Sequence, residues 1–396
     1  MIRGQEYPMQ QTEAPLAERV APLVGALPPA PPSSIAVIES IATGAPARVV
    51  DQNDAAVRTA ALFADPTQRE RVTRIHRNTM VNTRHLAVDP IDDEFTGVRT
   101  TPANIRERMN LFYAHAAPLA VDVAGRAVAA VPGAAADIGL LVFVTSTGFI
   151  APGVDVAVIR GLGLSPTVSR LVVNFMGCAA AMNGIRTASD YVRAHPDRKA
   201  LLVCLEMSSV NAAFADDVND IITHSLFGDG AAAVVIGAGA VQHPLSPGKV
   251  VIRDTFTHLF DDAADGIVLG VNHNGITCEL SPDLPDYILA GVRPAVTAAL
   301  APHDLGIADI DAWAIHPGGP KIISESVRSL GVAPEVAAAS WDVLAGYGNL
   351  LSVALLFVLE HLVAQEDADS TISTGVAFSF GPGVALEGML FDIIRR

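Results

Sequence analysis

Aromatic and basic side chains are both scarce in this sequence of 396 residues. Aromatic residues make up 5% of the chain although half of it is hydrophobic, so the core is expected to consist mainly of Ala, Val, Leu and Ile. The 26 Lys and Arg are outnumbered by 42 Asp and Glu, which gives a net charge of −16. This balance argues against a nucleic-acid partner, although a few local arginines can still bind an anionic small molecule.

Cysteines and long apolar runs are also few. The three cysteines show no paired spacing, which favours a reducing cytoplasm over a disulfide framework. The apolar stretch 127–144 is interrupted by Pro132 and Asp137, and 350–363 is too short to cross a bilayer. We therefore expect a soluble cytoplasmic protein without a transmembrane segment, and we find no cluster of metal ligands in the sequence.

The chain divides by composition into an arm and two halves. Residues 1–33 end in a Pro-rich stretch and are expected to form a flexible arm, followed by halves at 34–243 and 244–396. Apolar runs typical of buried strands alternate with helical patterns, which indicates an α/β fold. The predicted strands are 34–41, 138–145, 170–175, 200–205, 231–236, 250–255, 312–315 and 371–376. The predicted helices are 105–131, 179–194, 284–300, 321–330 and 351–365.

One cysteine lies where a strand should end and a helix should begin. Gly177 and Cys178 follow the apolar run 171–175 and precede the helical pattern that begins at 179. The partial positive charge of a helix N-terminus lowers the pKa of a thiol, and Gly177 leaves room for a substrate carbonyl. Taken alone, Cys178 could equally be an inert core cysteine.

Three further motifs lie in the second half. His316-Pro317-Gly318-Gly319-Pro320 places a histidine at a strand end before a turn, and Gly348-Asn349 precedes an apolar helix. Phe378-Ser379-Phe380-Gly381-Pro382-Gly383 is predicted to be a tight loop able to bring backbone N–H groups near a bound carbonyl. Separately, these motifs also fit a structural histidine, a helix cap and a simple turn.

In their order and spacing, these motifs together resemble the type III polyketide synthases, the chalcone synthase-like branch of the thiolase superfamily. Ser225-Leu226-Phe227-Gly228-Asp229-Gly230 adds a further motif, and the resemblance covers residues 34–396. The chain is most similar to mycobacterial-type long-chain alkyl α-pyrone synthases. The resemblance implies a five-layered αβαβα thiolase fold built from two similar halves and a homodimer. It also implies acyl-CoA and malonyl-CoA as substrates, with no bound cofactor.

The resemblance also implies roles for single residues. Cys178 would accept the starter acyl group, and His316 would hold the thiolate as an ion pair. His316 and Asn349 would then stabilise the enolate that malonyl-CoA forms on losing carbon dioxide. Arg71 and Arg74 match positions that bind CoA phosphates. The expected gating and cavity positions are Phe227, Cys278, Thr147, Ala151, Ser208, Gly381, Pro382 and Gly383.

Small side chains at Thr147, Ala151 and Ser208 suggest room for an alkyl chain. We therefore predict a medium-to-long aliphatic starter, two malonyl extensions and lactonisation to an alkyl α-pyrone. The alternatives are a ketoacyl synthase III-like enzyme that uses acyl carrier protein, a thioester hydrolase and a non-catalytic acyl-CoA-binding protein. The second-half motifs favour the polyketide branch.

Overall fold

A computed structural model describes residues 34–91, 104–211, 218–240, 245–272, 275–365 and 371–396. The arm predicted over residues 1–33 and the boundary predicted at 243–244 lie outside the described residues. The division into two halves therefore stays a prediction.

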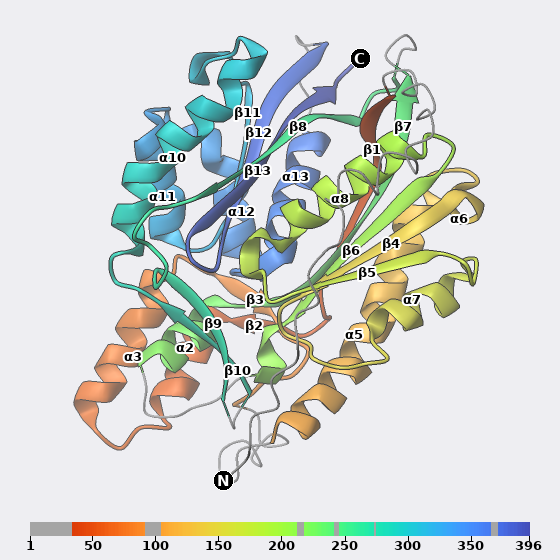
Figure 1. The fold of residues 1–396 in the computed structure, drawn as a ribbon. Coiled ribbons are helices and arrows are strands. Elements are labelled where there is room, and N and C mark those ends of the chain that lie inside the picture. Colours follow the sequence, from red (N-terminus) through yellow and green to blue (C-terminus); the bar gives the residue numbers. More distant parts are fainter. Residues whose placement is uncertain (1–33, 92–103, 212–217, 241–244, 273–274, 366–370) are drawn as a thin grey trace, which may run out of the picture. The chain divides into compact units, whose positions relative to one another are not determined.

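Apolar strands form the centre of the fold (Figure 1). Within the described residues, nine strands make one sheet in the order β11-β12-β13-β8-β1-β7-β6-β4-β5. The strands nearest the middle, β1 and β8, pair only over Ala36–Ile38 and Val250–Ile252, so the sheet consists of two halves with a short join. The sheet strands are β1 (Ser34–Gly44), β4 (Ile138–Thr145), β5 (Ser169–Asn174), β6 (Lys199–Met207), β7 (Asp229–Ala240), β8 (Val250–Leu259), β11 (Ala312–Ile315), β12 (Ile372–Gly381) and β13 (Ala385–Ile394). Two short pairs accompany it: β2 (Val49–Asp51) with β3 (Thr83–His85), and β9 (Ile267–Asn272) with β10 (Gly275–Leu280).

Helices cover both faces of each half of the sheet. The helices within the described residues are α2 (Gln52–Ala60), α3 (Pro66–Asn78), α5 (Ile105–Ala129), α6 (Ala134–Asp137), α7 (Val154–Leu162), α8 (Ala180–Ala194), α9 (Val218–Leu226), α10 (Leu284–Leu300), α11 (Pro320–Leu330), α12 (Ala338–Tyr347) and α13 (Ala354–Ala364). Of these, α2, α3 and α9 pack on one another and on the short strand pairs. Short 3₁₀ turns connect several of them, among them η2 (Gly177–Ala179), η3 (Ser208–Asn211) and η7 (Leu351–Val353).

Side chains that alternate along the strands separate three hydrophobic cores. Val142 on β4 and Ala377 on β12 point into a central core that α8 and α13 fill. The opposite face of β4, with Leu141, packs against α5 and α7. The opposite face of β12, with Val376, packs against α10 and α11. The layers are therefore helix, sheet, helix, sheet, helix, which confirms the predicted five-layered thiolase fold.

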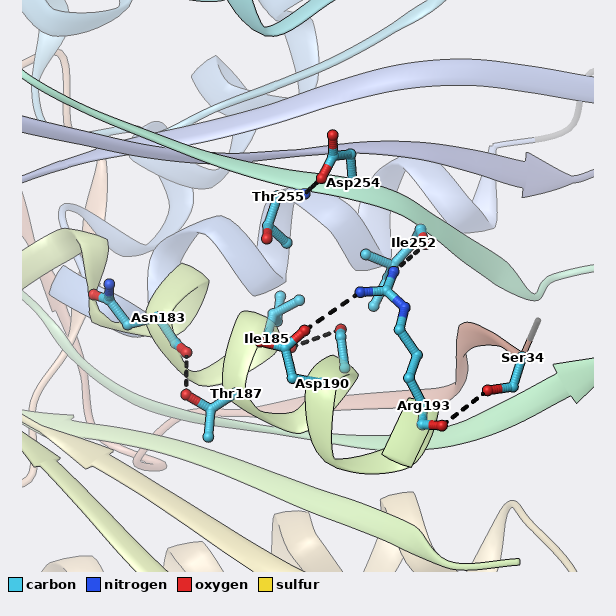
Figure 2. A network of polar contacts seen from close by, with 10 residues as sticks. Ser34, Asn183, Ile185, Thr187, Asp190, Arg193, Ile252, Asp254 and Thr255 are labelled. Carbon is cyan, nitrogen blue, oxygen red and sulfur yellow. Dashed lines mark hydrogen bonds and ion pairs between the residues drawn. The ribbon is translucent and has the colours of Figure 1, made fainter. Parts of the chain in front are cut away.

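The C-terminal end of α8, the helix that follows Cys178, is anchored to the sheet. Arg193, in the last turn of α8, donates a hydrogen bond of 3.1 Å to the carbonyl oxygen of Ile252 on β8 (Figure 2). The carbonyl oxygen of Arg193 accepts a hydrogen bond of 3.1 Å from Ser34 Oγ on β1. Because β8 and β1 lie at the join of the two half-sheets, these bonds fix α8 between them.

Candidate active site

Cys178 lies in the 3₁₀ turn η2, between β5 and α8. Gly177 has φ +57°, and a Cβ there would lie 3.2 Å from Pro382 Cδ and 3.4 Å from Leu269 Cδ1, so glycine is needed for both conformation and space. The N–H of Gly177 donates to Ser146 Oγ at 3.1 Å. Ser379 Oγ donates to the carbonyl oxygen of Cys178 at 2.8 Å, which ties the turn to β12.

Asn349 is positioned by its backbone. It follows α12 and forms a parallel β-bridge with Phe227. Its N–H donates to the carbonyl oxygen of Leu226 at 2.9 Å, and its carbonyl oxygen accepts from Gly228 N–H at 3.0 Å. Two predicted motifs from opposite halves of the sequence thus meet at this bridge.

The side-chain amide of Asn349 is held in one orientation. Its Oδ1 accepts a hydrogen bond of 2.8 Å from the N–H of Leu351, so Nδ2 must point to the other side. Nδ2 donates to the carbonyl oxygen of Gly318 at 3.2 Å. The same side chain hydrogen-bonds Cys178, which lowers the pKa of that thiol.

His316 lies at the end of β11, where its N–H donates to the carbonyl oxygen of Phe378 at 3.1 Å. The residue is 2% exposed, and neither ring nitrogen has a hydrogen-bond partner among the described residues. Burial lowers the pKa of His316 to about 3, because the charged imidazolium loses its hydration. The ring is therefore neutral, and a nitrogen is available to accept a proton.

The prediction of a lowered pKa for Cys178 is wrong. Burial raises the pKa of this thiol, and the nearby Cys278 and Glu206 raise it further. The hydrogen bonds from Asn349 and from the backbone N–H of Cys178 lower it, but they do not outweigh the desolvation of the thiolate. The free site therefore favours a neutral thiol at Cys178 and a neutral imidazole at His316, and not the predicted resting ion pair.

Glu206 is a buried residue of the site that the sequence analysis missed. Its carboxyl, at the end of β6, accepts hydrogen bonds from Ser146 N–H at 2.9 Å, Thr147 Oγ1 at 2.8 Å and Ser352 Oγ at 2.6 Å. Burial raises the pKa of Glu206 to about 7 despite these donors. The sequence signal was available, since a lone glutamate ends an otherwise apolar strand run.

Two cavities adjoin these residues. A cavity of about 50 Å³ brings together four predicted positions, Thr147, Ser208, Phe227 and Cys278, and its wall also includes Leu351. Ala151 lies apart from them, on a second cavity of about 790 Å³ with a largely apolar wall that includes Phe112, Phe143, Phe149 and Val154. Thr145 lines the larger cavity and its Oγ1 lies 3.3 Å from Thr147 Oγ1, so the two threonines separate the cavities.

The segment 378–383 is only partly the loop that the sequence predicted. Residues 378–381 continue strand β12, because Phe378 and Phe380 are buried in the core beside α10 and α11. Only the turn beyond Gly381 is a loop, and the N–H of Gly383 is already donated to the carbonyl oxygen of Ile267 at 2.9 Å. This turn packs against Gly177 through Pro382 and so supports the Cys178 turn.

Arg71 and Arg74 lie on α3, and both are exposed. The buried face of the same helix carries Val72 and His76. The two guanidinium groups are therefore accessible to an anionic ligand in solvent.

Two domains of one known protein family match most of the chain. The N-terminal domain of the chalcone and stilbene synthases matches residues 32–240, and the C-terminal domain of the same family matches residues 253–395. The chain belongs to the chalcone and stilbene synthase family. It is therefore a type III polyketide synthase, an acyltransferase that condenses malonyl-CoA with loss of carbon dioxide.

Relatives and solved structures of this family resemble the chain over most of its length. The chain is 65% identical to the alpha-pyrone synthesis polyketide synthase-like Pks18 of Mycobacterium tuberculosis, over 93% of this chain and 94% of Pks18. The crystal structure of PKS-I from the brown alga Ectocarpus siliculosus has a TM-score of 0.84 and 38% identity, over 91% of this chain and 99% of PKS-I. The type III polyketide synthase domain of Steely1 from Dictyostelium has a TM-score of 0.83 and 27% identity, over 91% of this chain and 99% of that domain.

Membership of this polyketide synthase family does not favour the carrier-protein-dependent or the non-catalytic alternative. Among the helices that the structure describes, none is long and apolar enough to span a membrane.

Proposed function

We propose that this type III polyketide synthase loads a medium- or long-chain aliphatic acyl-CoA on Cys178, extends it with malonyl-CoA and releases an alkyl α-pyrone. The carrying observation is that Asn349 links Cys178 and His316: it hydrogen-bonds Cys178 and donates to Gly318, against which the ring of His316 packs. His316 has two ring nitrogens without a hydrogen-bond partner among the described residues. The likeness to Pks18, whose name states alpha-pyrone synthesis, supports the product class.

Loading begins with a proton transfer. Because burial raises the pKa of Cys178, the thiol needs a base, and neutral His316 accepts its proton. The thiolate attacks the carbonyl carbon of the starter thioester, and CoA leaves as a thiolate that takes the proton back. A thioester on Cys178 remains.

Extension uses the same buried groups on a second substrate. Malonyl-CoA loses carbon dioxide, and its electron pair forms an enolate whose oxygen accepts hydrogen bonds from Asn349 and His316. The enolate carbon attacks the thioester on Cys178 and expels the thiolate, so the lengthened chain is carried on CoA and returns to Cys178 for the second extension. The enol oxygen of the twice-extended chain then attacks the carbonyl carbon of its CoA thioester. The C–S bond breaks, CoA leaves as a thiolate that takes up the enol proton, and the α-pyrone closes.

The two cavities support an aliphatic starter. Thr147 borders the small cavity, and its hydrogen-bonding neighbour Thr145 lines the larger one. The larger cavity has a mostly apolar wall and a volume of about 790 Å³, which is in the range of cofactor and ligand sites. An alkyl tail that extends past Thr147 would exchange water for this apolar wall. Phe227 and Cys278 border the small cavity and would gate the approach of the CoA esters.

Arg71 and Arg74 are proposed to hold the phosphates of CoA, because both are exposed on a helix that packs against α9, and α9 ends beside Phe227. Three free cysteines and CoA substrates support the cytoplasm as the compartment.

A homodimer is proposed through the edge strand β5. Its Leu171 and Val172 are 39% and 47% exposed, and the nearby Phe149 is 59% exposed. Among the described strands β5 pairs with β4 alone, so its other edge carries unpaired backbone groups. An apolar edge of this kind would be covered by a second copy of the chain.

A product assay tests the proposed function. Malonyl-CoA is supplied with a series of starter CoA esters from acetyl to stearoyl and with aromatic esters, and products are identified by mass spectrometry beside Cys178→Ala. Alkyl pyrones from the longer starters, absent with Cys178→Ala, are expected. Products from short or aromatic starters alone would refute the aliphatic preference.

A further inference from the structure

A buried arginine, Arg84, lies beneath the bridge between Phe227 and Asn349. Arg84 is on β3 and is 4% exposed. Its Nη1 donates a hydrogen bond of 3.2 Å to the carbonyl oxygen of Phe227 and another to that of His224. One guanidinium group therefore holds the end of α9 and the residue that pairs with Asn349.

The stem of Arg84 holds the other side of the bridge. Gly348 has φ +71°, and a Cβ there would lie 3.1 Å from Arg84 Cγ, so the arginine stem packs directly against the residue before Asn349. The neighbouring Thr83 donates to the carbonyl oxygen of Gly346 at 2.8 Å, and Asn82 N–H donates to that of Ala345 at 2.8 Å. Residues 82–84 thus hold the C-terminal end of α12, which directly precedes Asn349, in place.

Gln52 fixes the orientation of the guanidinium. Its Oε1 accepts a hydrogen bond of 3.1 Å from Arg84 Nε, and its Nε2 donates to the carbonyl oxygen of Ser225 at 2.6 Å. Nε2 also donates to Thr79 Oγ1 at 3.0 Å, just beyond α3. The guanidinium group of Arg84 is therefore held at Nε by Gln52 and at Nη1 by the backbone carbonyls. A lysine, which has a single side-chain nitrogen, cannot reproduce this arrangement.

The positive charge of buried Arg84 loses hydration, and nearby groups have to offset this loss. Desolvation lowers the pKa of Arg84 to about 10, and the nearby carboxyls of Asp229 and Asp89 offset part of that effect. Arg84 therefore stays charged at neutral pH, and its hydrogen bonds to carbonyl oxygens are charge-assisted.

We propose that Arg84 is a positioning residue for Asn349 and Phe227: held by Gln52, it clamps the two backbone segments that form their bridge and so aims the Asn349 amide at Cys178. This role rests on the proposed function for its effect on catalysis, but its geometric effect on Cys178 can be measured without any turnover.

The test compares Arg84→Lys and Gln52→Met with wild type, with Asn349→Ala as the reference for a lost amide. The matched control is Arg395→Lys, because Arg395 also donates to several backbone carbonyls, of Leu362 and Gln365, outside the candidate site. Alkylation of Cys178 by iodoacetamide is followed across pH by peptide mapping, with Cys278 as an internal reference.

Both variants, like Asn349→Ala, should slow alkylation of Cys178, because the hydrogen bond that lowers its thiol pKa is weakened or lost. About a fivefold loss of rate near pH 8 is expected for Arg84→Lys, with a smaller loss for Gln52→Met. Cys278 should react as in wild type. Unchanged alkylation of Cys178, or faster alkylation of both cysteines, would overturn the proposal, the latter because it reports a loosened fold.

A second measurement tests whether the contacts of Arg84 affect catalysis. Malonyl-CoA decarboxylation by Arg84→Lys should show a kcat lowered about tenfold, with KM within about twofold of Arg395→Lys. If Arg84→Lys changes kcat and KM by no more than Arg395→Lys does, the positioning role is contradicted. If wild type itself releases no carbon dioxide, the proposed function fails, while the alkylation arm still decides the role of Arg84.

Discussion

The backbone N–H of Leu351 donates a hydrogen bond of 2.8 Å to Oδ1 of Asn349. Leu351 has φ +51°, a left-handed conformation that costs a branched residue about 1 kcal/mol. The bond leaves the amide N–H groups of Asn349 facing Gly318 and Cys178. The orientation of the amide is therefore set by a locally strained turn.

Replacing Asn349 with aspartate tests whether that amide acts as a donor. A carboxylate cannot donate a hydrogen bond and would repel both the Cys178 thiolate and the malonyl enolate. Release of carbon dioxide from malonyl-CoA should fall about 100-fold. Asn110→Asp, an exposed position on α5, adds the same charge as a control. Decarboxylation by Asn349→Asp within a few-fold of that control would show that the amide is not needed.

Glu206→Gln should make Cys178 more reactive. The carboxyl raises the pKa of the thiol, so its neutral replacement should lower that pKa and speed alkylation by iodoacetamide near pH 8. Slower or unchanged alkylation would mean that the charge of Glu206 does not act on Cys178.

Glu206 also predicts a pH dependence of stability. Its folded-state pKa is raised to about 7 from an ordinary 4.5, so between these values the folded protein holds a proton that the unfolded chain has released. The free energy of unfolding, relative to Glu206→Gln, should therefore fall as pH rises from about 4.5 to about 7 and level off above. Urea unfolding of both proteins across this range measures the difference, and parallel curves would refute it.

Ser208 tests the route of the starter. Its Oγ is buried without a hydrogen-bond partner among the described residues and lines the small cavity, so a larger side chain costs no hydrogen bond there. Ser208→Leu should reduce kcat/KM for palmitoyl-CoA about tenfold or more while acetyl-CoA is still accepted. Ser208→Ala, the matched control, should keep long starters. Equal losses for both starters with Ser208→Leu would argue against a tail that passes this position.

Arg71 and Arg74 should act on substrate affinity alone. Changing both to Glu should raise KM for acyl-CoA esters about tenfold, with little effect on kcat, because the phosphates lie far from the reacting carbonyl. Activity with N-acetylcysteamine thioesters, which lack the CoA phosphates, should be unaffected. Arg77→Glu on the same helix is the matched control, and an equal rise in KM there would indicate only a general effect of charge.

Val172→Lys should weaken the proposed dimer. A charge on the exposed edge strand β5 would have to be buried between two copies of the chain. Light scattering should give twice the chain mass of 41.3 kDa for wild type and a lower average mass for the variant. A wild-type monomer, or an unchanged dimer of the variant, would place the interface elsewhere or exclude it.

Elements whose apolar residues follow a regular strand or helix pattern were the easiest to predict. The ranges expected at 138–145, 312–315 and 284–300 coincide with β4, β11 and α10. Strand β13 was missed because Glu387 and Gly388 interrupt its apolar run. The structure explains the glutamate, since its carboxyl forms an ion pair with Arg186 of α8. Such a pairing joins residues that are distant in sequence, and no local pattern reveals it.

The candidate site was predictable in its residues and less so in its electrostatics. Cys178, Asn349 and Phe227 were found by motif, and the structure brings them together. The direction of the thiol pKa was wrong because burial depends on packing that a helix N-terminus does not disclose. Arg84 was missed because its partners are two backbone carbonyls and the side chain of Gln52, which is distant in the sequence, so no local pattern reveals them.

The most direct test of the central claim is a pulse and chase on the enzyme itself. Wild type is incubated with lauroyl-CoA alone, freed of excess ester, mapped by mass spectrometry and then given malonyl-CoA. We predict a lauroyl thioester on Cys178 that is converted to the alkyl pyrone of the same starter. A lauroyl group on another residue, or its release as free lauric acid on the chase, would contradict the proposed mechanism.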